Sequence, residues 1–121
     1  GYGLSYTTFR YANLNVEQRG SNRFHITFEV SNTGDRDGEE VAQLYLHDQV
    51  ASVVQPMLQL KHFARIFIPK GATKQVAFDL LPTDFTFIGA DMQPTLEPRS
   101  IDIGIGSASN NLLLRATIHT E

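Results

Sequence analysis

The sequence FHITFEV, at residues 24–30, determines the class of fold. Apolar side chains occupy its even-numbered positions, and His25, Thr27 and Glu29 occupy the odd-numbered ones. Successive side chains of a β-strand point to opposite faces of a sheet, so a period of two indicates a strand. We therefore predict a strand here with one buried face and one solvated face.

The same alternation returns on both sides of this stretch. It occurs at residues 75–80, 101–106 and 112–119 and, less regularly, at 9–14. Each segment has the length of a single short strand. In the last regular segment the residues expected to face the core are Leu112, Leu114, Ala116 and Ile118.

Two further runs, residues 41–46 and 63–68, are apolar on nearly both faces. Such runs are typical of central strands, or of strands whose outer face is covered. The candidates for a second covered face are Val41, Tyr45 and Phe67.

Turn signals separate these segments. Residues 32–38 (NTGDRDG) form a polar loop whose two glycines can take a positive φ, and residues 69–71 (PKG) predict a tight hairpin turn. Residues 81–85 (LPTDF) predict one helical turn capped by Thr83. About seven short strands joined in this way predict an all-β protein, an antiparallel β-sandwich.

Composition limits the classes of function. The chain has 121 residues, a net charge of −3 and no cysteine. This length suits one domain. The sequence has no basic stripe for nucleic acid, and no apolar run approaches the ~20 residues that cross a bilayer. Disulfides and thiolate metal sites are excluded because there is no cysteine.

No group of residues has the spacing of a catalytic or metal site. Glu39 and Glu40 are adjacent where a strand begins, so they should point to opposite faces. They could not flank one glycosidic bond, which needs two carboxyl groups about 5–9.5 Å apart. The four histidines have no ligand spacing, and two of them are expected on solvated strand faces, His25 and His119. We expect no catalytic residue, no cofactor and no metal in this chain.

Several segments, in order, resemble one known domain. They are residues 1–7 (GYGLSYT), 30–34 (VSNTG), 38–46 (GEEVAQLYL), 60–66 (LKHFARI) and 101–107 (IDIGIGS). Together they resemble the C-terminal fibronectin-III-like domain of family 3 glycoside hydrolases. The resemblance implies an all-β, fibronectin-III-like or immunoglobulin-like antiparallel β-sandwich of about seven strands. Residues 1–8 would be the linker from upstream catalytic domains, and residues 9–121 the domain itself.

The resemblance also implies a function. The chain would be a non-catalytic accessory domain that docks on and stabilises the upstream catalytic domains of the same polypeptide. The parent would be a periplasmic or extracellular β-glucosidase or β-xylosidase that hydrolyses terminal β-linked sugars by a retaining mechanism. The aspartate nucleophile and glutamate acid/base of such enzymes have no matching motif here. A homodimer contact in the parent is a further expectation.

Interdomain contacts are expected in two segments that lack clean alternation, residues 1–6 and 48–59. The residues predicted to make them are Tyr2, Leu4, Tyr6, Tyr45 and Pro56. The alternative is a carbohydrate-binding module that anchors the enzyme to polysaccharide. That reading requires exposed aromatic side chains on which sugars stack.

Overall fold

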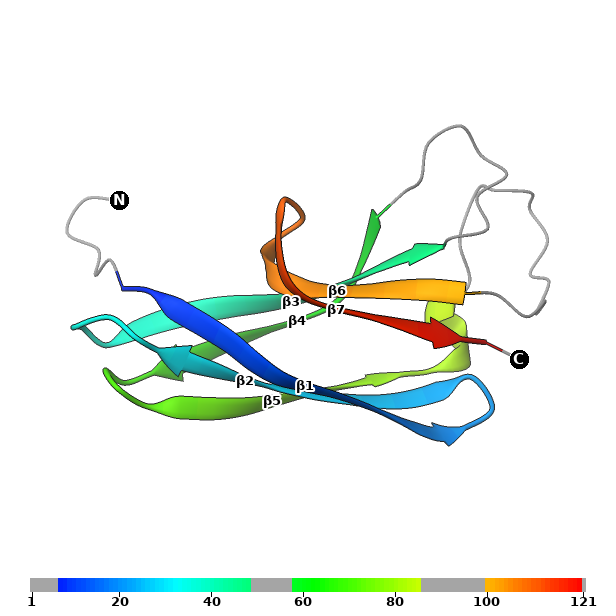
Figure 1. Cartoon of the computed structure of the whole chain (residues 1–121), viewed down its shortest axis with the longest axis horizontal. Coiled ribbons are helices and arrows are strands. Elements are labelled where there is room, and N and C mark those ends of the chain that lie inside the picture. Colours follow the sequence, from blue (N-terminus) through cyan, green and yellow to red (C-terminus); the bar gives the residue numbers. More distant parts are fainter. Residues whose placement is uncertain (1–6, 49–57, 86–99, 121) are drawn as a thin grey trace.

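The structure is a computed structural model that describes residues 7–48, 58–85 and 100–120. These residues form two antiparallel sheets that pack against each other (Figure 1). One sheet has the strand order β1-β2-β5 and the other the order β4-β3-β6-β7, which confirms the predicted β-sandwich of about seven strands. The elements are β1 (Phe9–Gly20), β2 (Arg23–Asn32), β3 (Gly38–Asp48), β4 (Leu58–Ile68), β5 (Thr73–Leu80), a 3-10 helix η1 (Pro82–Phe85), β6 (Ser100–Ala108) and β7 (Asn111–His119).

The core lies between the two sheets. From the three-stranded sheet it takes the apolar positions of β2, which are at most 5% exposed: Phe24, Ile26, Phe28 and Val30. From the four-stranded sheet it takes the fully buried Leu44, Leu46, Ile103 and Ile105. Each such side chain contributes about 1.5–3 kcal/mol when it leaves water. The alternation at residues 24–30 therefore reports the core directly, as predicted.

The two strands that are apolar on both faces have different positions in the sheet. β3 is central, between β4 and β6, as predicted for residues 41–46. β4, which contains residues 63–68, is instead an edge strand. The expectation of a covered outer face is also wrong for Phe67 within this chain, because its side chain is 55% exposed. Val41 and Tyr45 are half-buried.

One buried side-chain amide holds together the end of the sandwich where the chain enters. Asn32, at the end of β2, is only 2% exposed. Its Oδ1 accepts hydrogen bonds from the Thr7 hydroxyl (2.5 Å) and the Gly34 N–H (3.0 Å). Its Nδ2 donates to the carbonyls of Arg36 (2.7 Å) and Ile68 (2.9 Å). Asn32 thus makes hydrogen bonds to three segments: the chain before β1, the β2–β3 loop and the end of β4.

The glycines of the β2–β3 loop serve a different purpose from the one predicted. Neither Gly34 nor Gly38 has a positive φ. A Cβ at either position would collide with the side chain of Thr7. Their role is to let the chain before β1 approach the loop closely, because a larger residue would displace Thr7 from Asn32.

The turn at residues 69–71 forms as predicted, but it is not a hairpin. The Ala72 N–H donates to the Pro69 carbonyl at 2.9 Å, and Gly71 has a φ of 78°. This is the positive φ that the third position of a type II turn requires. The turn joins β4 of one sheet to β5 of the other, so it crosses between the layers.

The predicted helical turn at residues 81–85 is the 3-10 helix η1, but Thr83 does not cap it. The Asp84 carboxylate instead accepts the Leu81 N–H at 2.8 Å, and the Asp84 N–H donates to the Leu81 carbonyl at 2.8 Å. Among the described residues no helix is long and apolar enough to cross a membrane.

Tyr11 links the two sheets at the level of the core. Its ring stacks on that of Phe28, with centroids 5.9 Å apart, and its hydroxyl donates to the Glu40 carboxylate on β3 at 3.0 Å. Burial raises the pKa of Tyr11 above its ordinary value, and the neighbouring charge of Glu40 raises it further.

The Asn32 contacts predict a large effect of removing this amide. We expect Asn32→Ala to lower the free energy of unfolding by about 2–4 kcal/mol, because it leaves buried backbone groups without partners. Urea denaturation followed by circular dichroism measures the change. Asn15→Ala, at an exposed position of β1, is the control and should change it little. Equal losses in the two variants would show that the amide is not a structural hub.

The raised pKa of Tyr11 predicts a specific loss of stability in alkali. The folded state holds the phenol proton more tightly than the unfolded chain does, so this contribution is complete below the ordinary pKa of 10.0 and is lost above it. We expect stability to fall above pH 10 by up to about 1.4 kcal/mol per pH unit from this group. Tyr11→Phe should remove that slope and Tyr45→Phe should keep it, in urea titrations on both sides of pH 10. An identical slope in both variants would contradict the assignment.

Candidate interaction face on the four-stranded sheet

The structure places only one of the predicted interdomain residues. Tyr2, Leu4, Tyr6 and Pro56 lie outside the described residues. Tyr45 is half-buried on the outer face of β3, where its hydroxyl donates to the Gln43 side chain at 2.5 Å. The outer face of the four-stranded sheet therefore carries the one predicted contact residue that lies within the described part of the chain.

Thr7 and Thr8, which the sequence assigns to the linker, are bonded to the sandwich. The Thr7 hydroxyl binds Asn32, and the Thr8 carbonyl accepts the Thr33 N–H at 2.9 Å. The last residues of the expected linker are thus fixed beside the end of β2 and the loop that leads to β3. The boundary between linker and domain stays a prediction.

An apolar strip runs along β4 on the outer face of the four-stranded sheet. We call it the β4 strip. It consists of Leu58, Leu60, Phe63 and Phe67, whose side chains are 44%, 48%, 67% and 55% exposed. Their partners on β3 include Tyr45, opposite Leu60, and Gln43, opposite Phe63.

A register shift explains why even- and odd-numbered residues share this strip. Leu44 pairs with His62, but the next residue of β3, Tyr45, pairs with Leu60, so β4 contains one extra residue at Lys61. An extra residue of this kind reverses the alternation beyond it. The outer face therefore takes residues 63 and 67 on one side of the shift and 58 and 60 on the other. Because the alternation is interrupted at Lys61, a period of two in the sequence does not predict that these four residues share one face.

An exposed ion pair lies within the β4 strip. Arg65 lies between the two phenylalanines in sequence, and its Nε is 3.6 Å from the Glu39 carboxylate. Such exposed pairs contribute little to stability. Two large aromatic side chains this exposed on one strand are uncommon on a free surface and are typical of an interaction site.

A hollow lies on the other half of the same sheet, over β6 and β7. We call it the β6 hollow. It measures about 600 Å³, and its polar lining consists of His47, Asp102, Ser109, Arg115 and Thr117. Its apolar lining includes Leu58 and Leu112, with Gly104 between the strands.

The strand register brings the polar groups of the β6 hollow into two rows. His47, Asp102 and Thr117 are direct neighbours across β3, β6 and β7, and Gly104 lies opposite Arg115. The Asp102 carboxylate accepts the Thr117 hydroxyl at 2.8 Å and lies 3.4 Å from Nδ1 of His47. These contacts hold the carboxylate in one orientation.

Leu112 lines this hollow and not the core, contrary to the prediction. β7 contains one extra residue, because Ile105 pairs with Leu114 but Gly106 pairs with Leu112. The shift at Leu113 moves Leu112 to the outer face, where it packs over Gly104. Leu114, Ala116 and Ile118 keep the inward direction that the alternation predicts.

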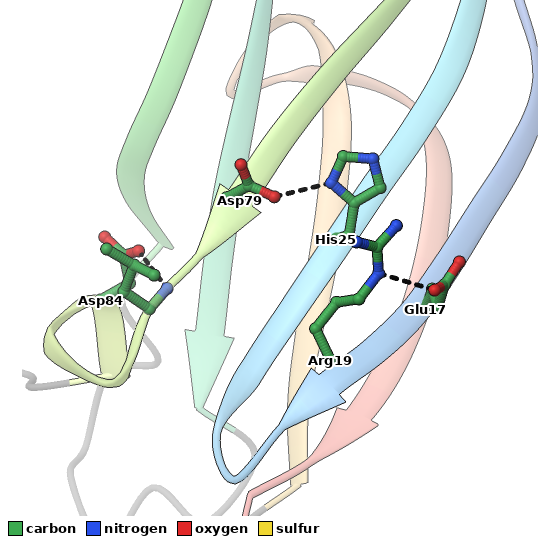
Figure 2. Close-up of polar contacts among 6 residues, drawn as sticks. Glu17, Arg19, His25, Asp79 and Asp84 are labelled. Carbon is green, nitrogen blue, oxygen red and sulfur yellow. Dashed lines mark hydrogen bonds and ion pairs between the residues drawn. The ribbon is translucent and has the colours of Figure 1, made fainter.

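Histidines beyond the β6 hollow make structural pairs. His25 of β2 lies 2.6 Å from Asp79 of β5, across the three-stranded sheet, as Figure 2 shows together with the Arg19–Glu17 ion pair. His62 of β4 lies 3.2 Å from Asp84 of η1. In residues 7–48, 58–85 and 100–120, no three His, Asp or Glu side chains converge as metal ligands would.

The adjacent glutamates Glu39 and Glu40 point to opposite sides of β3, as predicted. Glu39 faces Arg65 on the outer surface, whereas Glu40 accepts a hydrogen bond from Tyr11 of the opposite sheet. These two carboxylates cannot act on the same bond, since one reaction centre needs both on one side.

Comparison with known proteins gives a consistent result. A family model described as a fibronectin type III-like domain matches residues 40–109. A beta-xylosidase of Formosa agariphila is 37% identical over 90% of the chain, and a periplasmic beta-glucosidase of Salmonella typhimurium is 36% identical over 88%. The solved structure of a GH3 beta-glucosidase of Bifidobacterium adolescentis matches with a TM-score of 0.85 and 30% identity over 98% of the chain. The chain spans only 16%, 14% and 18% of these three proteins.

The exposure of the β4 strip predicts that its aromatic side chains contribute little to folding. We expect the double variant Phe63→Thr, Phe67→Thr to change the free energy of unfolding by less than about 1 kcal/mol, because threonine keeps the β-propensity of the strand. Phe28→Ala, in the core, should cost about 3–5 kcal/mol. Both are measured by urea denaturation. A loss in the strip variant as large as that of Phe28→Ala would mean that the strip is part of the fold and not of a surface.

Proposed function

The chain belongs to the fibronectin type III-like domains of family 3 glycoside hydrolases, and from this we propose that it is a non-catalytic accessory domain of such an enzyme. It docks on the catalytic domains of the same polypeptide and stabilises them. The observation that carries this proposal is the exposed β4 strip on a chain that spans 14–18% of its relatives.

The place where the chain enters the sandwich supports this choice of partner. Thr7 contacts Gly38, which pairs with Ile68 at the end of β4. The next pair along the strands joins Glu39 to Phe67. Thr7, the first residue that the structure describes, therefore lies at the end of the sandwich where β4 ends (Figure 1). A domain tethered on that side would be close to Phe67, the last residue of the β4 strip.

Covalent attachment also relaxes the affinity that docking requires. A short tether gives an effective concentration of about 1 mM. With a Kd of about 10 μM for the contact, the domain would be docked in about 99% of the molecules. Four apolar side chains and a few polar contacts suffice for such an affinity. Tyr2, Leu4, Tyr6, Tyr45 and Pro56 remain our predicted further contacts.

The names of the relatives bear on which part of the enzyme selects the sugar. The chain is similarly close to a protein named beta-xylosidase and to one named periplasmic beta-glucosidase. A domain shared so evenly is poorly suited to distinguish glucose from xylose. We propose that the parent hydrolyses terminal β-linked sugars by a retaining mechanism in the periplasm or outside the cell, with its acid/base and nucleophile upstream of Gly1.

Calorimetric titration of the 121-residue chain into the separately produced upstream region tests the docking. We expect saturable binding, weakened at least tenfold by Phe63→Thr, Phe67→Thr, because the contact loses its apolar centre. Leu81→Thr is the control, since Leu81 is 44% exposed but lies outside the β4 strip. Unchanged binding by the double variant would reject this docking face. Turnover of an aryl glucoside or xyloside by the chain alone would reject the non-catalytic role.

A further inference from the structure

The β6 hollow has the size and shape of a small-ligand site. At about 600 Å³ it falls within the range of such pockets, roughly 300–1,000 Å³. It extends over β7 and β6 to Leu58, the first residue of β4, which it shares with the β4 strip. The other residues of the β4 strip, among them Phe63 and Phe67, do not line it.

Leu112 packs directly over the centre of β6 because residue 104 has no side chain. A Cβ at Gly104 would lie 2.6 Å from Cδ1 of Leu112. A larger residue there would push Leu112 away from the sheet and change the hollow that Leu112 lines.

The walls combine a hydrogen-bond acceptor with donors. Asp102 has a side chain that is 40% exposed, and its orientation is fixed by Thr117 and His47. Arg115 is exposed opposite Gly104 and presents a guanidinium with five N–H donors. The Ser109 hydroxyl can donate or accept a hydrogen bond, and the Thr117 hydroxyl, which already donates to Asp102, can accept one.

The charges of the hollow favour a neutral ligand. One carboxylate and one guanidinium leave the lining close to zero net charge when the histidine is neutral. Asp102 would repel an anion and Arg115 would repel a cation. This repulsion would cancel part of the favourable electrostatic energy that either ion gains from the oppositely charged residue. A molecule with many hydroxyls and a C–H face satisfies donors, acceptors and the apolar side chains Leu58 and Leu112 together.

We propose that the β6 hollow binds one neutral pyranose unit of a sugar, with Asp102 and Arg115 hydrogen-bonded to neighbouring hydroxyls. This inference goes beyond the docking proposal and does not depend on it. It gives the chain a contact with carbohydrate that requires no exposed row of aromatic side chains. The described lining contains none apart from the imidazole of His47.

Nuclear magnetic resonance titration of the labelled 121-residue chain with glucose, xylose and cellobiose tests the site. We expect saturable shifts centred on Asp102, Gly104, Arg115 and Thr117 with at least one of these sugars. Arg115→Gln should weaken binding about tenfold, as the loss of a charged hydrogen bond of 1.4 kcal/mol or more implies. Arg65→Gln, on the same face but outside the hollow, is the matched control and should leave binding unchanged.

Two further measurements keep the outcome decisive. Asp102→Asn preserves the size of the side chain and should weaken binding while the amide spectrum stays folded. Glucuronate should bind more weakly than glucose. Linear shifts with every neutral sugar, shifts centred elsewhere, equal effects of the two arginine variants, or tighter binding of glucuronate would each overturn the proposal. None of these results involves the upstream region, so failure here is distinct from failure of docking.

Discussion

The buried amide of Asn32 is the constraint on which the rest of this structure depends. It bonds Thr7, Gly34, Arg36 and Ile68, which belong to three parts of the chain: the segment before β1, the β2–β3 loop and the end of β4. Without it, the ends of β2 and β4 and the chain before β1 would have no common partner. A satisfied buried polar group of this kind fixes geometry more sharply than apolar packing does. It also fixes the position at which Thr7, the first described residue, meets the sandwich.

That surface owes its character to two extra residues in the strands. The extra residue at Lys61 turns Leu58 and Leu60 toward the side on which Phe63 and Phe67 already lie. The extra residue at Leu113 moves Leu112 out of the core and over Gly104. One shift builds the apolar half of the face, and the other builds a wall of the hollow. These two register shifts thus determine which apolar side chains the outer face of the four-stranded sheet exposes.

Much of the fold could be predicted because local alternation reports burial directly, as residues 24–30 show. Position in the sheet is harder to predict, since an apolar edge strand has the same residue pattern as a central strand, as residues 63–68 show. The direction of Leu112 required the pairing of two strands. The role of Asn32 cannot be predicted locally, because it depends on two distant segments, at Thr7 and Ile68, meeting at the β2–β3 loop. Gly34 and Gly38 were assigned to turn geometry, although Thr7 is what requires them.

Of the candidate site, Tyr45 was placed on the outer face of the sheet. Phe63, Asp102 and Arg115 were missed, because one sequence does not show which residues are neighbours across strands.

We propose that the sandwich is one part of a larger enzyme and that the catalytic part covers its exposed aromatic strip. Hydroxyl-radical footprinting of Phe63 and Phe67, in the intact parent and in the isolated 121-residue chain, tests this most directly. Both phenylalanines should be strongly protected in the parent, while Leu81 should be labelled equally in both. Equal labelling of the two phenylalanines in both proteins would contradict it.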